Sequence, residues 1–234
     1  MKVLIIIPVY NESENILKVI EELKKENSSY DILIVNDGST DNTLKVLEGQ
    51  DVKIINNTFN MGYSHSIQLG IKYAYKNSYD YGVLFDGDNQ HVASYIPELL
   101  NEAINNNSDL VIGSRYLNRG YKQYFFRLLG TKIFSVIIKI CCHKKISDPL
   151  SGMQCLNRKT MKYYATMENF PNYVDANLLI DLLLKKYKIS EVPVKMRQRE
   201  NGISMHSGII KPIRYMLSML YIIVITILLN IRRD

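Results

Sequence analysis

Short, almost continuously apolar runs alternate with segments of helical spacing through the first half of the chain. The apolar runs cover 3–9, 31–37, 52–55, 81–86 and 109–114. Runs of this length without polar alternation are typical of strands that are buried on both faces of a parallel sheet. Between them, apolar residues recur every three or four positions, as at Ile16, Ile20 and Leu23, which predicts amphipathic helices. The alternation predicts a doubly wound, Rossmann-like α/β sheet.

Polar clusters follow four of these predicted strands directly. Their sequences are PVYNE (8–12), NDGSTD (36–41), FDGDNQH (85–91) and GSRY (113–116). Ligands of such sheets bind outside the carboxyl ends of the strands, where these clusters fall. We therefore expect the four clusters to contribute to one site.

The second half of the chain has a different pattern. We expect an apolar helix with a few cations over 123–142, packed either against the sheet or at a membrane interface. Pro149 and Gly152 interrupt the pattern in the segment 148–154. A further helix is expected over 174–187 and a strand over 188–197.

The last segment, 215–231, holds seventeen uncharged residues between Lys211 and Arg214 on one side and Arg232 and Arg233 on the other. A straight span needs about 20 apolar residues. We therefore expect this helix to span a thinned bilayer or to lie at the interface with its cations on lipid headgroups. A core or dimer helix is the alternative. The predicted division is a catalytic domain over 1–208 and a membrane-associated helix over 209–234.

Composition narrows the classes of partner. Lys and Arg number 29 against 23 Asp and Glu, without a basic run of the kind that binds nucleic acid, so we expect no nucleic-acid partner. The mild positive charge suits anionic lipid or phosphorylated ligands. Cys141, Cys142 and Cys155 have neither disulfide nor metal spacing, and we expect them to be reduced.

The segment after the fourth strand contains two carboxylates, Asp86 and Asp88, one residue apart. One Asp would serve as a helix cap, so the second indicates a cation. With Gly87 allowing an unusual backbone angle between them, the pair suits Mg²⁺ or Mn²⁺ that also binds phosphate oxygens. Such a metal on a diphosphate would stabilise the charge that develops on a leaving nucleotide.

Asp37 and Tyr10 follow two other strands. A carboxylate at a strand end can accept a hydrogen bond from the ring N–H of a nucleobase, on which Tyr10 could stack. The alternative is that Asp37 only shapes its own turn. His91 and His206 lie near the expected phosphate site, and we expect neither to bind the metal directly.

Seven motifs, in this order, resemble the family-two glycosyltransferases of GT-A fold. They are PVYNE, NDGSTDNT, NMG (60–62), FDGDNQH, GSRY, DPLSG (148–152) and EVPVKMRQRENGIS (191–204). The resemblance is strongest to the dolichyl-phosphate and polyprenyl-phosphate sugar synthases and extends to about residue 205. It implies a mixed sheet of GT-A type with a nucleotide-sugar site.

The resemblance also implies roles for individual residues. Those on the nucleotide-sugar side are Pro8, Tyr10, Glu12, Asp37, Asn60 and Gly62. Asp86 and Asp88 match the metal-binding pair, with Asp88 the more direct ligand, and Gln90 matches their neighbour in the lipid-linked branch. The residues that match the loop over the donor diphosphate are Arg199, Gly202 and Ser204, and those toward the acceptor are Arg115, Ser151 and Gly152.

The sequence departs from the family pattern at three places. Asn36 replaces a frequent Asp, Met153-Gln154 replaces an aromatic residue and Arg, and Asn177 replaces a common Glu beside Asp175. Asp175 is the candidate general base on the acceptor side. If it faces the sugar, a hydroxyl or a phosphate acceptor is allowed. If it faces a helix partner, a phosphate acceptor, which is already ionised and needs no base, is the better choice.

We therefore expect an inverting, metal-dependent hexosyltransferase. Its donor would be a nucleotide sugar, with UDP-sugars first, and its acceptor a polyprenyl phosphate or lipid-linked glycan. It would act at the cytoplasmic face of a bacterial inner or plasma membrane in cell-envelope polysaccharide synthesis, alone, as a homo-oligomer or with a membrane-protein partner. The alternatives are a transferase acting on a polysaccharide hydroxyl and a non-catalytic nucleotide-sugar-binding partner.

Overall fold

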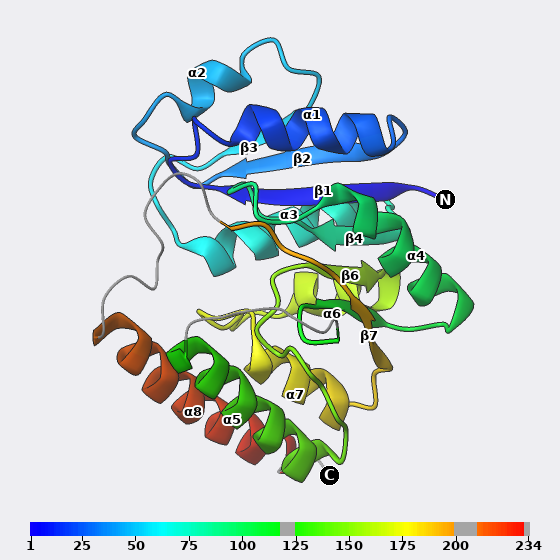
Figure 1. Ribbon diagram of the computed structural model, residues 1–234, viewed down its shortest axis with the longest axis vertical. Coiled ribbons are helices and arrows are strands. Elements are labelled where there is room, and N and C mark those ends of the chain that lie inside the picture. The colour runs from blue at the N-terminus through cyan, green and yellow to red at the C-terminus, as the bar shows by residue number, and fades with distance from the viewer. Residues whose placement is uncertain (118–124, 199–209, 232–234) are drawn as a thin grey trace.

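A seven-stranded mixed sheet with helices on both faces forms the described part of the chain (Figure 1). The computed structural model describes residues 1–117, 125–198 and 210–231. The strands are β1 (Val3–Val9), β2 (Asp31–Asn36), β3 (Lys53–Asn56), β4 (Tyr81–Leu84), β5 (Leu110–Ser114), β6 (Gln154–Asn157) and β7 (Ile189–Pro193). Their spatial order is β3-β2-β1-β4-β6-β5-β7, and β6 alone runs antiparallel to its neighbours. The predicted doubly wound mixed sheet is confirmed.

The helices divide into two groups by the face of the sheet that they cover. They are α1 (Ile16–Glu26), α2 (Thr43–Leu47), α3 (Tyr63–Lys76), the 3₁₀ helix η1 (Ala93–Tyr95), α4 (Ile96–Asn105), α5 (Phe125–Cys142), α6 (Arg158–Thr166), α7 (Ala176–Leu184) and α8 (Ile210–Ile231). One core joins the sheet to α1, α2, η1 and α4, and the other joins it to α3, α6, α7 and parts of α5 and α8.

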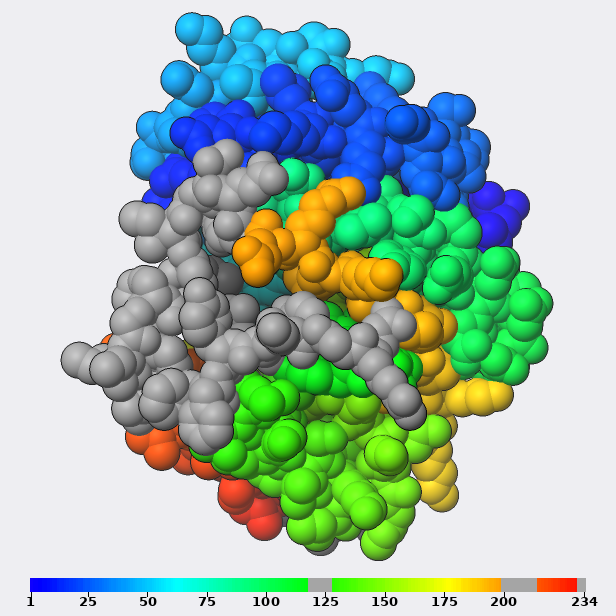
Figure 2. Space-filling model, viewed as in Figure 1, coloured from blue at the N-terminus to red at the C-terminus, as the bar shows by residue number. Residues whose placement is uncertain are grey.

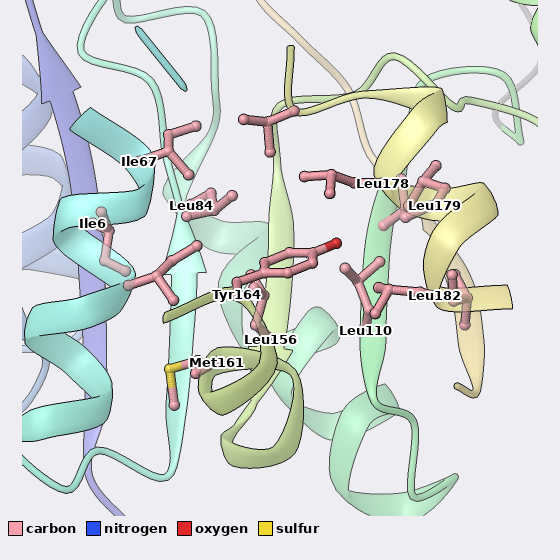
Figure 3. Close-up of a cluster of buried hydrophobic side chains, with 14 of the residues drawn as sticks. Ile6, Ile67, Leu84, Leu110, Leu156, Met161, Tyr164, Leu178, Leu179 and Leu182 are labelled. Carbon is pink, nitrogen blue, oxygen red and sulfur yellow. The ribbon is translucent and has the colours of Figure 1, made fainter. Parts of the chain in front are cut away.

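Side chains of successive strand residues enter opposite cores. Leu4 and Ile6 of β1 belong to one core, and Ile5 and Ile7 belong to the other. Burial on both faces explains the continuous apolar runs in the sequence. In the core that contains Leu4 and Ile6, Tyr164 of α6 is fully buried. Figure 3 shows its ring between side chains from α3 and β4 on one side and the leucines of α7 on the other.

The strand β6 and the helix α6 were not predicted. β6 has only four residues, QCLN, too few and too polar at both ends to form a recognisable apolar run. Because β6 runs against β4 and β5, the loop before it reaches the edge at which the parallel strands end. The strand predicted over 188–197 is shorter than expected and ends at Pro193.

Helices α5, α7 and α8 pack together at one end of the molecule (Figure 1). Phe134 and Ile138 of α5 are buried, and α5 packs on α7. Helix α8 also lies on α7, with Met219 and Ile223 buried in the contact. No helix within the described ranges combines the length and hydropathy that a membrane crossing needs. The boundary predicted between 208 and 209 falls in a range that the structure does not describe.

Replacing Met219 with Ala tests the packing of α8 on α7. Met219 has 0% exposure, so its truncation should lower the free energy of unfolding by about 2–4 kcal/mol. The matched change Leu228→Ala, at an exposed position of the same helix, should cost less than about 0.5 kcal/mol. Urea unfolding followed by circular dichroism measures both. Equal, small losses would mean that α8 is not docked in solution.

Candidate active site

The candidate active site lies at the edge where β1, β2, β4 and β5 end. Parallel strands place PVYNE, NDGSTD, FDGDNQH and GSRY at this edge, as predicted. The antiparallel strand β6 adds the loop 148–153, and the N-terminus of α7 adds Asp175. Segments that are far apart in the sequence therefore contribute to a single site.

Asp37 is 3% exposed and holds the neighbouring loop 57–62. Its Oδ1 accepts hydrogen bonds from Asn57 Nδ2 at 2.9 Å and from the Met61 N–H at 2.9 Å, and its Oδ2 accepts from the Gly62 N–H at 2.8 Å. Asp37 therefore places Gly62 and its neighbour Asn60 beside the ends of β1 and β2. This contact was not foreseen, and the contact of Asp37 with a nucleobase stays a prediction.

The turn after Asp37 requires glycine. Gly38 has φ +68°, and a Cβ on it would lie 2.6 Å from the carbonyl carbon of Phe59. Any other residue would push the loop 57–62 away from Asp37.

The PVYNE segment presents one exposed aromatic ring. Tyr10 is 45% exposed, and a planar ligand has access to it. Pro8 is paired with Val35 inside the sheet. The Glu12 carboxylate accepts from Asn15 Nδ2 at 2.7 Å, and the Glu12 carbonyl accepts from the Ile16 N–H, so Glu12 shapes the start of α1.

The Asp86 carboxylate accepts one side-chain hydrogen bond and lies close to His91 and Gly152. Tyr63 Oη donates to Oδ1 at 2.9 Å, and His91 Nε2 lies 3.4 Å from Oδ2. The Asp86 N–H donates to His91 Nδ1 at 3.0 Å, which leaves the proton of a neutral imidazole on Nε2. A Cβ on Gly152 would lie 3.0 Å from Asp86 Oδ2, so any other residue here would displace the Asp86 carboxylate. Burial and the Asp86 charge raise the pKa of Tyr63, which keeps it a donor.

The loop that follows Asp86 turns at a different residue from the one predicted. Asn89 has φ +62°, whereas Gly87 does not adopt a positive φ, so the expectation of an unusual angle at Gly87 is wrong. Gly87 packs closely against β1 instead, because a Cβ on it would lie 3.1 Å from Val9 Cγ2. Within the loop, Asp88 Oδ1 accepts from the Gln90 N–H at 3.1 Å.

Arg197 fastens this loop to α1. Its guanidinium donates to both oxygens of Glu22 at 2.7 and 2.8 Å, and to Asn89 Oδ1 and the His91 carbonyl. The Arg197 N–H donates to the Gln90 carbonyl at 2.9 Å, and Gln90 Nε2 donates to the Arg197 carbonyl. In Figure 2 the orange segment, which contains Arg197, lies directly below blue α1 and beside the blue-green residues that follow β4. Sequence patterns gave no sign of the pair, because its partners are 175 residues apart.

Asp86 and Asp88 fit a divalent cation that shares its ligands with a phosphate. They supply hard carboxylate oxygens beside a strand end, and the Asp86 side chain is 27% exposed. Within the described residues, no group of three or more His, Cys, Asp and Glu side chains gathers around one point. Mg²⁺ is commonly held by one or two carboxylates plus substrate phosphates, so two suffice. The site therefore suits a metal that arrives with a diphosphate.

The acceptor-side residues form a buried frame. Arg115 donates from Nε and Nη2 to the two oxygens of Asp148, each at 2.7 Å, and both side chains are buried. Ser151 Oγ donates to the Gly113 carbonyl at 2.6 Å. Arg115 and Ser151 thus hold the loop that places Gly152 against Asp86, and their contact with an acceptor stays a prediction.

Asp175 is the N-terminal cap residue of α7, but its side chain does not cap the helix. Its Oδ2 accepts from Tyr215 Oη of α8 at 2.7 Å. Burial raises its pKa to about 6; Tyr215 and Arg115 oppose this rise, and the charges of Asp86 and Asp148 add to it. Asp175 therefore lies within electrostatic range of the acidic loop. The sequence analysis did not find Tyr215, because its partner Asp175 lies 40 residues away in the chain.

Three predicted loop residues, Arg199, Gly202 and Ser204, lie outside the described residues, as does His206. The cysteines Cys141, Cys142 and Cys155 are free, as expected.

The mixed sheet with its acidic loop after β4 defines a glycosyltransferase fold of the GT-A class. Glucosyl-3-phosphoglycerate synthase from Mycobacterium tuberculosis, solved with Mn²⁺, uridine diphosphate and glucosyl-3-phosphoglycerate, has a similar fold. The TM-score is 0.73 at 17% identity, with 98% of this chain and 79% of that chain covered. The family model of glycosyl transferase family 2 matches residues 4–164. The chain belongs to this family and is a glycosyltransferase.

Three curated relatives are similar over most of this chain. Dolichol-phosphate mannosyltransferase of Pyrococcus furiosus is 34% identical over 89% of the chain, which spans 60% of that protein's length. UDP-N-acetylglucosamine–dolichyl-phosphate N-acetylglucosaminyltransferase of Methanococcus voltae is 29% identical over 82% of the chain and 84% of its own length. Polyprenol monophosphomannose synthase of Mycolicibacterium smegmatis is 25% identical over 88% of the chain and 82% of its own length.

Replacing Asp175 with Asn should stabilise the protein at alkaline pH. The folded-state pKa of about 6 exceeds the ordinary value near 4, so the folded protein holds a proton that the unfolded chain has released between these pH values. The free energy of unfolding therefore falls as pH rises through this window. Asp175→Asn removes this loss and should gain on the order of 1 kcal/mol at pH 8 and little at pH 4.

Urea unfolding at the two pH values, without added metal, measures this difference. Asp51→Asn, an exposed carboxylate away from the site, serves as the matched control and should show no pH-dependent gain. A loss of stability at pH 8 in Asp175→Asn would show that the carboxylate is a net stabilising partner of Tyr215.

Proposed function

We propose that this glycosyltransferase moves a hexose from a nucleotide sugar to a polyprenyl phosphate with inversion at the anomeric carbon. The observation that carries the proposal is the meeting of Asp86, Asp88 and Asp175 at one edge of the sheet. Metal-binding carboxylates and a carboxylate of raised pKa would then lie within electrostatic range of each other, as donor and acceptor sides of one reaction require.

On the donor side, Tyr10 would stack on the base and Asp37, with the loop of Asn60 and Gly62, would line the nucleoside site. Asp86 and Asp88 would hold Mg²⁺ or Mn²⁺, which would neutralise charge on the leaving diphosphate when bound. Arg199 and Ser204 would complete the diphosphate contacts. The UDP in the name of the Methanococcus relative, and in the solved complex of the Mycobacterium synthase, makes a UDP-sugar the first donor to test.

On the acceptor side, Asp175 is suited to receive a proton. Its pKa of about 6 matches the second pKa of a phosphate monoester, which is also about 6, so the two groups can share one proton near neutral pH. Tyr215 occupies only Oδ2, so a helix partner engages one oxygen of Asp175, which favours a phosphate acceptor because a phosphate needs less help from a base than a hydroxyl does. The names of the relatives, which specify dolichyl and polyprenyl phosphates, support the same acceptor.

A lipid acceptor would be met at a membrane surface, and α5 and α8 are suited to contact one. Exposed apolar residues are concentrated on these two helices; they are Leu129, Val136, Ile140, Leu217, Tyr221, Val224, Ile225, Leu228 and Leu229. On α5, Lys132 and Lys139 are exposed at helical spacing from Val136. An apolar stripe with flanking cations is typical of a helix that lies in the interface of an anionic bilayer.

We infer that the enzyme works at the cytoplasmic face of a membrane, where nucleotide sugars are present, and supplies lipid-linked sugar for cell-envelope polysaccharide. The mixed apolar and basic surface would equally allow a membrane-protein partner or a second copy beside it.

The first test is transfer of radiolabelled sugar from UDP-glucose, UDP-galactose, UDP-N-acetylglucosamine or GDP-mannose into an organic-extractable polyprenyl-phosphate product. We expect label in the lipid phase with Mn²⁺, loss with EDTA, and at least a 100-fold lower rate in Asp88→Asn, because the diphosphate charge would no longer be neutralised. Asp51→Asn is the matched control and should transfer at the wild-type rate.

Label in a polysaccharide and not in lipid would indicate a hydroxyl acceptor. Donor binding without transfer to any acceptor would indicate a non-catalytic nucleotide-sugar-binding protein. Either result would refute the polyprenyl-phosphate proposal.

Membrane contact through α8 can be tested by flotation with vesicles that contain anionic lipid. The double change Val224→Glu and Leu228→Glu adds two charges to exposed positions and should reduce flotation at least tenfold, since charge is costly in an apolar interface. Ile104→Glu, at another exposed apolar position, on α4, should float like the wild type. Equal flotation of all three proteins would place the membrane contact elsewhere.

A further inference from the structure

The C-terminal helix reaches the candidate active site through one side chain. Tyr215, in the second turn of α8, donates from Oη to Asp175 Oδ2 at 2.7 Å. Its ring packs edge-on against Tyr173, with ring centroids 5.0 Å apart. The contact therefore joins two helices, α7 and α8, at the carboxylate that the proposed function assigns to the acceptor side.

The remainder of α8 holds Tyr215 in this place. Met219 and Ile223 follow at intervals of four residues and are buried on the same side of the helix. Near the other end, Asn230 Nδ2 donates to Asp181 Oδ1 at 3.0 Å, and Lys185 Nζ donates to Asn230 Oδ1 at 2.6 Å. A polar contact at each end and an apolar contact between them fix both the rotation and the register of α8 on α7.

The opposite side of α8 carries the exposed apolar residues Leu217, Tyr221, Val224 and Leu228. These lie roughly half a turn from the stripe of Tyr215, Met219 and Ile223. One rigid helix thus presents a surface suited to lipid on one side and a donor to Asp175 on the other.

We propose that Tyr215 is a positioning residue that fixes the Asp175 carboxylate, and that α8 is thereby a structural part of the active site as well as its membrane contact. The hydroxyl holds Oδ2 and leaves Oδ1 to face the acceptor. This inference rests on the proposed function for the role of Asp175 and extends it to a residue outside the family motifs described above.

Besides burial, four neighbouring groups change the pKa of Asp175. The Tyr215 hydroxyl and the Arg115 guanidinium favour its charged form, and the carboxylates of Asp86 and Asp148 oppose it. Tyr63 lies within range of the Asp175 charge as well. Removing the hydroxyl alone leaves all the other groups in place, so Tyr215→Phe isolates its contribution.

The test compares Tyr215→Phe with Tyr81→Phe, the same change at a half-buried tyrosine that begins β4, at the end of the strand away from the acidic loop. For Tyr215→Phe we expect kcat to fall roughly tenfold, with little change in the KM of the nucleotide sugar. The acid limb of log kcat/KM, which reports ionisation of the free enzyme, should move to higher pH because the charged carboxylate loses a donor. Tyr81→Phe should match the wild type in all three quantities. The acceptor phosphate titrates in both variants alike, so a shift seen in Tyr215→Phe alone comes from the enzyme.

Wild-type kcat and an unshifted acid limb in Tyr215→Phe would overturn the proposal, and so would a lower kcat with an unshifted limb, which would indicate a merely structural role. If the wild type transfers no sugar at all, the proposed function is refuted, whereas the contact between Tyr215 and Asp175 can still be tested. The pH dependence of unfolding then still tests the contact. Tyr215→Phe should lose more stability than Tyr81→Phe between pH 4 and 8, and equal losses would overturn the proposal.

Discussion

Repulsion among carboxylates is the constraint that the site must satisfy. Asp86, Asp88 and Asp175 all lie within electrostatic range of Tyr63 at the edge of the sheet, and the Asp86 charge also acts on Asp175. Like charges that are partly withdrawn from water raise the cost of ionisation unless donors surround them. The chain supplies the Tyr63 hydroxyl to Asp86 and the Tyr215 hydroxyl to Asp175, and the Arg115 charge also favours the ionised form of Asp175. A bound cation with its diphosphate would relieve the remaining repulsion.

The reversed strand β6 makes this arrangement possible. If every strand were parallel, the segment before β6 would lie at the far edge, away from the carboxyl ends of β1 and β4. Instead the loop 148–153 enters the site edge, where the buried pair of Arg115 and Asp148 holds it in shape. A buried ion pair is weak evidence for stability, but it specifies geometry well when all its donors are satisfied. Here that geometry keeps Gly152 against Asp86.

Much of the fold and part of the site could be predicted from local patterns. Apolar runs located the long strands, and their ends located Asp37, Asp86 and Asp88, because both depend on neighbouring residues in sequence. Four-residue β6 lacked a pattern, and the left-handed angle fell on Asn89 and not on Gly87. The contacts of Arg197 with Glu22 and of Tyr215 with Asp175 join residues far apart in the chain. Local periodicity cannot report such pairings.

The placement of α8 has a physical consequence for an enzyme that takes its acceptor from a bilayer. A helix that only anchors the protein can rotate or slide without affecting chemistry. Helix α8 is held in one register by Tyr215, Met219 and Asn230, so a displacement at its lipid-facing side would be transmitted to Asp175 through a packed, hydrogen-bonded contact. Under the proposed function, correct seating on a membrane and correct orientation of the acceptor-side carboxylate would therefore be the same structural event.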